Sequence, residues 1–151
     1  MNRNVEVKTV MLIRKPAKEV FEAFTDPAVT TKFWFTKSSG PLKPGERATW
    51  EWEMYHVKVD VNVLAFEPGK RLSIEWSAPG QSETQVEWTF TAQSDRTTFV
   101  QVRNRGFEGD DDAIVAKALD SMGGFSLMLA SAKAWLEHGL DLKLIADHRP
   151  H

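Results

Sequence analysis

Hydrophobic and polar residues alternate with a period of two through most of the first hundred residues of this chain. The alternating segments are 5–13, 48–54, 57–63, 72–77, 85–90 and 100–103. Pro68-Gly69, Pro79-Gly80 and Ser94-Asp95-Arg96 supply turns between later segments. Alternation of this kind places one set of side chains in a core and the other in water, which is typical of antiparallel strands joined by short turns. We therefore predict an antiparallel sheet of about six strands.

Two short helices are expected after the first strand. Pro16 suits the first position of a helix, because its φ is fixed near the helical value. Apolar residues then follow at helical spacing, at Val20, Phe21 and Phe24. Asp26-Pro27 ends this helix, since a residue before proline avoids the α conformation. A second helix is predicted at 28–35, where it would bury Val29, Phe33 and Trp34.

One long helix is predicted over 110–139. Asp110-Asp111-Asp112 places acid at the positive end of the helix dipole, and Gly139 is a favoured residue just after a helix. The expected buried stripe is Met122, Phe125, Leu129, Ala132, Leu136 and Leu140. Ser126 and Ser131 are expected to lie off this stripe. The last residues, 141–151, are expected to form a flexible tail.

Gly123-Gly124 interrupts the long helix, although glycine costs up to roughly 1 kcal/mol there against alanine. Two interpretations remain open. The glycines could allow close packing on the sheet or a gentle bend, or the missing side chains could leave room for a ligand.

The composition is that of one ordinary globular domain spanning 1–151. The net charge is −2, which gives no reason to expect binding to nucleic acid. The chain contains no cysteine, so disulfides and thiolate metal sites are excluded, and a reducing cytoplasm is the expected location. No continuous apolar run approaches the length of a membrane span.

Tryptophan is unusually frequent, with six residues against a single tyrosine. Four of them, Trp50, Trp52, Trp76 and Trp88, share the inward parity of the predicted strands. Large rings on one bent sheet beneath one helix are hard to pack without a gap, so we predict an apolar cavity between sheet and helix. A close-packed core is the alternative. The predicted ligand-binding residues are Trp50, Trp52, Val59, Val61, Ile74, Trp76, Trp88, Phe90, Val102, Asn104, Met122, Phe125 and Leu129.

No catalytic residue, metal site or cofactor is predicted. The histidines His56, His138, His148 and His151 are dispersed, and no metal-binding, nucleophile or phosphate-loop motif is present. His56 is the one histidine placed where it could reach a cavity mouth. Glutamates of the alternating segments fall on the wet face of the sheet, at Glu51, Glu53, Glu75 and Glu87.

Several short segments carry a family resemblance. They are residues 16–27, Lys32-Phe33-Trp34, residues 67–72 with Glu75-Trp76, Arg105-Gly106-Phe107, and residues 135–139. In order and spacing the chain resembles the START-like (SRPBCC) superfamily and, within it, the activator of heat-shock-protein-ninety ATPase homologue (AHSA-type) family. Gly124-Phe125 departs from the Gly-Trp of many relatives but keeps the aromatic ring.

The resemblance implies an α+β helix-grip fold, a hydrophobic cavity and no fixed catalytic triad. Three functions follow as hypotheses. The first is binding of an apolar or aromatic small molecule. The second is a cyclase- or hydrolase-like activity, for which inward Asn104 is the polar candidate. The third is a co-chaperone-like or homodimeric interaction module, which an exposed apolar patch would favour.

Overall fold

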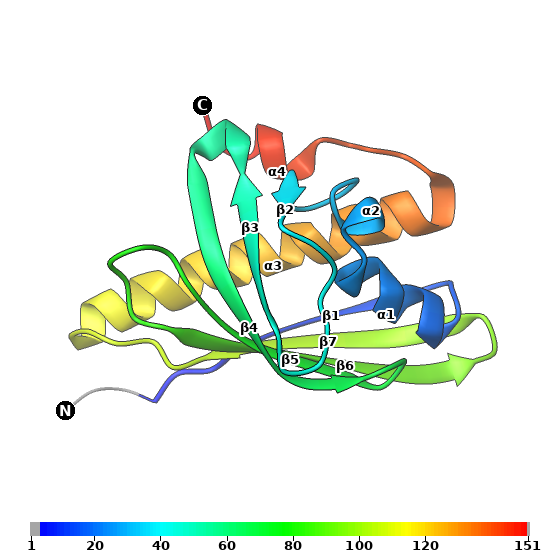
Figure 1. Ribbon diagram of the computed structural model, residues 1–151, viewed down its shortest axis with the longest axis horizontal. Coiled ribbons are helices and arrows are strands. Elements are labelled where there is room, and N and C mark those ends of the chain that lie inside the picture. The colour runs from blue at the N-terminus through cyan, green and yellow to red at the C-terminus, as the bar shows by residue number, and fades with distance from the viewer. Residues whose placement is uncertain (1–3, 151) are drawn as a thin grey trace.

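Seven antiparallel strands form one strongly curved sheet, and a long C-terminal helix lies across its inner side (Figure 1). The computed structural model describes residues 4–150. The strands are β1 Val7–Ile13, β2 Lys37–Ser38, β3 Arg47–Trp52, β4 Val57–Glu67, β5 Arg71–Ser77, β6 Thr84–Ser94 and β7 Thr97–Arg105. The helices are α1 Ala17–Thr25, α2 Pro27–Thr30, α3 Asp111–His138 and α4 Leu144–Asp147, with a 3-10 turn η1 at Glu53–Tyr55. The predicted α+β helix-grip fold is confirmed.

The strand order is β1-β7-β6-β5-β4-β3-β2, so the first strand pairs with the last and the others form a meander. The register brings inward residues opposite one another, as in Trp50 with Val59 and Leu72 with Trp88. Each pair shares one face because side chains alternate along a strand. The tryptophans on β3, β5 and β6 therefore share the inner surface of the sheet.

The sheet has one strand more than the sequence predicts. The addition is β2, which pairs Lys37 with Glu51 and Ser38 with Trp50 at the edge of the sheet. A strand of two residues is too short to show alternation, so its existence depends on its neighbour β3 and not on its own pattern.

Helix α1 fills one end of the curved sheet with aromatic rings. Phe21 meets Phe66 edge-on with a ring-centroid distance of 5.1 Å, and Phe24 lies 5.8 Å from Trp88. Helix α2 is shorter than the predicted helix 28–35, because it ends at Thr30. The segment after it bends back into the core with Phe33, Trp34 and Phe35 all buried.

Helix α3 begins and ends where the sequence predicts. The Asp110 side chain accepts a hydrogen bond from the backbone N–H of Ala113 at 2.8 Å. Gly139 closes the helix with φ of 65°, a conformation that glycine adopts without steric cost. By length and hydropathy alone this helix could cross a bilayer, but in the structure it is the core helix packed on β1 and the inner face of the sheet.

The buried stripe of α3 differs from the predicted one. Buried residues are Ile114, Ala118, Phe125, Met128, Leu129, Ser131 and Ala132. Met122 and Leu140 were predicted inside but are 45% and 53% exposed, so both assignments are wrong. Met122 lies three residues before Phe125 and is therefore rotated from it by about 60° around the helix, away from the buried side. A residue four positions before Phe125 is rotated from it by only about 40°. The prediction that Ser131 lies off the stripe is also wrong, because this residue is 7% exposed.

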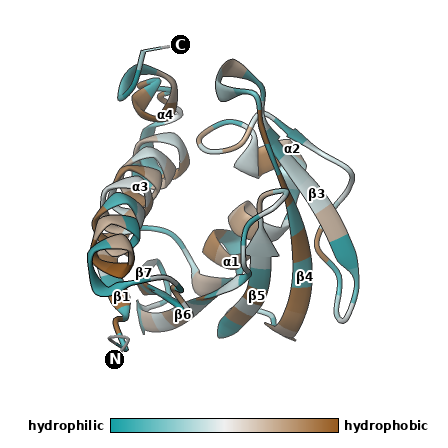
Figure 2. Ribbon diagram, turned by 90° about the vertical axis from the view of Figure 1, so that its left-hand side faces the viewer, coloured by the Kyte–Doolittle hydropathy of each residue, from teal (hydrophilic) through white to brown (hydrophobic). Residues whose placement is uncertain are grey.

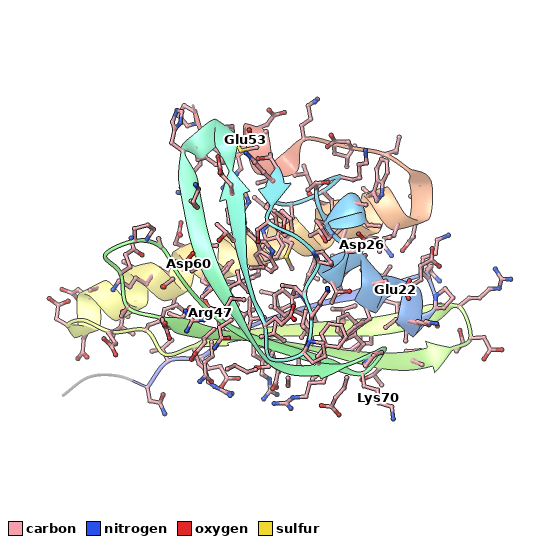
Figure 3. All side chains as sticks on the ribbon, in the orientation of Figure 1. Glu22, Asp26, Arg47, Glu53, Asp60 and Lys70 are labelled. Atoms are coloured by element: carbon pink, nitrogen blue, oxygen red, sulfur yellow. The ribbon has the colours of Figure 1, made fainter. Side chains whose placement is uncertain are left out.

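Charged side chains cover the outside of the molecule. The labelled residues in Figure 3, Glu22, Asp26, Arg47, Glu53, Asp60 and Lys70, are all exposed. On the outer face of the sheet, Arg71 bonds Glu87 at 2.8 Å across β5 and β6. This hydrogen bond raises the pKa of the Arg71 guanidinium above its usual value. The predicted wet face of the sheet therefore carries an ion pair between neighbouring strands.

A candidate ligand-binding pocket

A partly open pocket of about 550 Å³ lies between the strands β3–β6 and the N-terminal half of α3. The side view in Figure 2 shows these two walls, with α3 opposite β3, β4 and β5. Its inner lining is dominated by apolar side chains, namely Trp34, Trp52, Val59, Trp76 and Phe125. A pocket of this size is in the range of small-molecule sites in proteins.

Trp34 stands at the centre of the aromatic wall. Its ring centroid lies 5.6 Å from that of Trp52, 5.8 Å from Trp76 and 6.0 Å from Phe125. Phe125 in turn stacks on Trp76 at 5.6 Å with 27° between the ring planes. The rings come from α3, β3, β5 and the segment after α2, so the wall exists only when these elements pack together.

One hydrogen-bonded polar network interrupts this apolar surface. Asn104, 2% exposed, donates from Nδ2 to the carbonyl oxygen of Gln85 at 2.8 Å and to Thr84 Oγ1 at 3.1 Å. Trp76 Nε1 also donates to Thr84 Oγ1, at 3.0 Å. Ser121 Oγ donates to Asn104 Oδ1 at 2.7 Å. The network links β5, β6, β7 and α3 and holds its side chains in fixed positions.

The two glycines of α3 have open space where a side chain would be. A Cβ atom built on Gly123 or Gly124 meets no atom within 4 Å outside the helix's own backbone and chain neighbours. The interpretation that these glycines permit close packing on the sheet is therefore wrong. Gly124 lines the pocket, whereas Gly123 is exposed.

The C-terminal segment closes one side of the pocket. The sequence places 141–151 in a flexible tail, but in the structure α4 packs on η1 near the tips of β3 and β4 (Figure 1). The single hydroxyl hydrogen of Tyr55 is shared between the carbonyl oxygens of Ile145 and Ala146, the second at 2.8 Å. The rings of Tyr55 and His148 meet edge-on at 5.8 Å. His151 lies outside the described residues.

The histidine at the pocket is not the one that the sequence indicates. His56 is exposed with φ of 53° in the turn after η1, and it does not line the pocket. His148 lines the pocket instead, with Nδ1 lying 2.6 Å from the carbonyl oxygen of Ile145. No local pattern could show this, because the contact depends on how the tail folds back.

Charged residues of the lining belong to the mouth, where they are exposed. Lys117 Nζ donates to the carbonyl oxygen of Glu108 at 2.7 Å. Arg149 forms an ion pair with Asp120 and so connects the tail to α3. Among the described residues, no group of three or more histidine, aspartate or glutamate side chains could hold a metal ion.

The predicted ligand-binding residues separate into three groups. Trp52, Val59, Trp76, Asn104 and Phe125 line the pocket. The residues buried in the core outside the pocket lining are Trp50, Val61, Ile74, Trp88, Phe90, Val102 and Leu129. Met122 points to solvent and is not part of the pocket. The alternation of residues along a strand shows which side chains point inward. It cannot show which of these inward side chains border an open pocket and which are close-packed in the core.

Among the pocket residues that sequence reasoning misses, Trp34, Thr84 and Ser121 matter most for the inner lining. Trp34 is expected only to be buried, because its ring position is set by the turn after α2. Thr84 has the same parity as Val86 and Trp88, so alternation could have placed it on the inner face. Ser121 lies four residues before Phe125 and could have been found as the polar position of the buried stripe.

The sequence model of the Activator of Hsp90 ATPase homolog 1-like protein family matches residues 14–137, which is most of the chain. Among curated proteins, none matches.

Solved structures share the fold over nearly the whole chain. SSP2350 from Staphylococcus saprophyticus has a TM-score of 0.78 and 27% identity, covering 92% of this chain and 96% of that one. DynU16, from the dynemicin biosynthetic locus, has a TM-score of 0.79 and 25% identity, covering 92% of this chain and 49% of that one. The Aha1 dimer from Colwellia psychrerythraea has a TM-score of 0.71 and 18% identity, covering 89% and 98%.

Proposed function

We propose, from the premise that this chain belongs to the Activator of Hsp90 ATPase homolog 1-like family, that the protein binds an apolar or aromatic small molecule between its sheet and α3. The observation that carries the proposal is the aromatic pocket of about 550 Å³ beside Gly124. Burial of apolar ligand surface against these rings would drive binding, and the few polar groups would orient the ligand.

Gly124 is the position at which the proposal can be tested without touching the core. A leucine side chain at this position would extend into the pocket, because a Cβ atom there meets no neighbour within 4 Å. Gly123 is the matched control: it lies one residue earlier in the same helix, is exposed and does not line the pocket.

The experiment uses N-phenyl-1-naphthylamine, an uncharged fluorescent probe. The full chain should bind it with a rise in probe emission and quenching of tryptophan emission. Gly124→Leu should weaken this binding, whereas Gly123→Leu should leave it unchanged. No saturable binding to the unaltered protein, or equal loss of affinity in both variants, would overturn the proposal.

We propose binding and not catalysis because the amide groups of the buried residue Asn104 are already hydrogen-bonded to other residues of the protein. Asn104 uses its amide N–H groups on Thr84 and Gln85 and its oxygen on Ser121. The charged residues of the lining are exposed at the mouth. A cyclase or hydrolase would require a positioned acid or base near the ligand, and this network supplies neither.

Self-association through α3 is a second candidate function. It is favoured by the homodimeric module that the family resemblance implies and by one observation on the surface of α3. Val115, Leu119 and Met122 follow at spacings of four and three and are 36%, 67% and 45% exposed. Burial of such residues between two copies would be favourable. Sedimentation should therefore show a dimer that Leu119→Glu dissociates. Leu64→Glu, at a 47% exposed position of β4, is the control. A monomer at all concentrations would exclude this candidate.

A further inference from the structure

The orientation of the Asn104 side-chain amide is fixed by its hydrogen bond to the carbonyl oxygen of Gln85. The carbonyl oxygen of Gln85 can only accept a hydrogen bond, and it lies 2.8 Å from Asn104 Nδ2. Exchanging the oxygen and nitrogen of the amide would place two acceptors against each other. The amide nitrogen therefore faces Gln85 and Thr84, and the amide oxygen faces Ser121.

This orientation fixes the direction of the hydrogen bond from Ser121. Because Asn104 Oδ1 can only accept, Ser121 Oγ must be the donor of the 2.7 Å bond between them. A hydroxyl group has one hydrogen and two lone pairs. Once its hydrogen is used on Asn104, Ser121 presents only acceptor capacity to the pocket that it lines.

The Thr84 hydroxyl differs from the Ser121 hydroxyl, because its oxygen is the group already used in hydrogen bonds and its hydrogen is not. The indole N–H of Trp76 is a donor only, and the amide N–H of Asn104 is a donor in the orientation above. Both end on Thr84 Oγ1, at 3.0 and 3.1 Å, so both lone pairs of this oxygen are used. Among the hydrogen bonds of residues 4–150, none has the Thr84 hydroxyl as donor to a side chain or backbone acceptor. Its hydrogen is therefore the group that Thr84 offers at the pocket wall.

Resting on the proposed function, we infer that Thr84 and Ser121 form a donor–acceptor pair that selects an uncharged aromatic ligand carrying a ketone-type oxygen and a hydroxyl. Thr84 donates to the ligand's carbonyl oxygen, and Ser121 accepts from the ligand's hydroxyl. Both residues bond the same carboxamide group, so one small molecule can reach both. The aromatic skeleton lies against Trp34, Trp76 and Phe125.

The charge distribution supports an uncharged ligand. Glu108, Lys117, Asp120 and Arg149, which line the mouth, are exposed, and Asp120 and Arg149 pair with each other. The groups beside Trp76 and Phe125 are the neutral amide and the two hydroxyls. A carboxylate or ammonium group buried there would lose its hydration without meeting an opposite charge, which is strongly unfavourable.

The test compares three bicyclic probes of nearly equal size with the unaltered full chain. Tetralin has no polar group, 1-tetralone adds the acceptor, and 7-hydroxy-1-tetralone adds a donor that is too far from the ketone to bond it internally. Quenching of tryptophan emission gives each dissociation constant. Each added group should tighten binding about three- to tenfold, the range for one hydrogen bond made on binding.

Variants then assign each gain to one hydroxyl. Thr84→Val should abolish the advantage of 1-tetralone over tetralin, and Thr84→Ser, which keeps the hydroxyl, should retain it. Ser121→Ala should abolish the advantage of 7-hydroxy-1-tetralone over 1-tetralone. Ser126→Ala, at an exposed position of the same helix, should change neither ratio.

The outcomes separate this inference from the proposed function. If tetralin binds but the polar probes bind no more tightly, the donor–acceptor pair is wrong and the apolar pocket stands. The same follows if the probe ratios are unchanged in Thr84→Val and Ser121→Ala. If no probe binds the unaltered protein, tetralin included, both proposals fail. The ranking in the unaltered chain decides the inference even if a variant does not fold.

Discussion

The carboxylate of Glu137, in the last turn of α3, accepts a 2.8 Å hydrogen bond from the backbone N–H of Arg14, 123 residues earlier. Lys133 donates from Nζ both to this carboxylate at 2.6 Å and to the carbonyl oxygen of Leu12 at 2.7 Å. The Glu137 side chain is only 8% exposed. The end of the long helix is thereby fastened to the end of β1, which keeps α3 in place over the sheet.

The first prediction concerns the pH dependence of this contact. Burial raises the pKa of Glu137, but the hydrogen bonds from Lys133 and Arg14 lower it, and the net pKa lies below the usual 4.5. A lowered folded-state pKa means that the stabilisation is complete above pH 4.5 and is lost as the pH falls through the folded-state pKa. Glu137→Gln should therefore lower the free energy of unfolding at pH 7 by about 1–3 kcal/mol.

Urea denaturation at pH 7 and pH 3 measures this effect. The difference between the unaltered chain and Glu137→Gln should shrink at the lower pH, because below pH 4.5 the unfolded chain takes up a proton on Glu137 more readily than the folded chain. Glu53→Gln, at an exposed position, serves as the control. An equal difference at both pH values would show that the charge of Glu137 does not stabilise the fold.

The second prediction tests the register of the buried stripe. Leu129 is fully buried, so Leu129→Ala should lower the free energy of unfolding by roughly 2–5 kcal/mol, since it removes buried carbons and leaves a cavity. Ser126→Ala, on the exposed side, should change it little. Ser131 is a poor control because it is buried. Equal unfolding midpoints for the Leu129 and Ser126 variants would contradict the register.

The third prediction concerns the glycines of α3. Gly123→Ala and Gly124→Ala should each stabilise the protein by up to about 1 kcal/mol, because alanine is the better helix former. Neither new methyl group meets a neighbour within 4 Å. Thermal unfolding of both variants checks this. Destabilisation by Gly124→Ala alone would show that the space beside Gly124 is not open.

The fourth prediction concerns closure of the pocket by the tail. Tyr55→Phe removes the hydroxyl whose single hydrogen is shared between the carbonyl oxygens of Ile145 and Ala146, at a cost of about 1 kcal/mol. Hydrogen exchange of the backbone N–H groups in 144–147 should then become faster, with β6 as the internal reference. Unchanged exchange in the tail would show that Tyr55 does not hold α4.

Much of the fold follows from local pattern. The period-two alternation identifies the strands longer than two residues, and Asp110 and Gly139 mark the ends of α3 because capping depends on a few adjacent residues. The site is less predictable. Trp52, Trp76, Asn104 and Phe125 are named correctly as inward residues, but alternation gives only the face on which a side chain lies.

The sequence by itself determined the inner set of aromatic residues, the long helix and its two ends, since each depends on spacing along a few turns or strands. Only the tertiary structure decided which inward residues border an open pocket. It also decided that Ser121 meets Asn104 and that Tyr55 holds the tail 90 residues away. These contacts join segments whose approach depends on the packing of the whole sheet against α3, so no local pattern contains them.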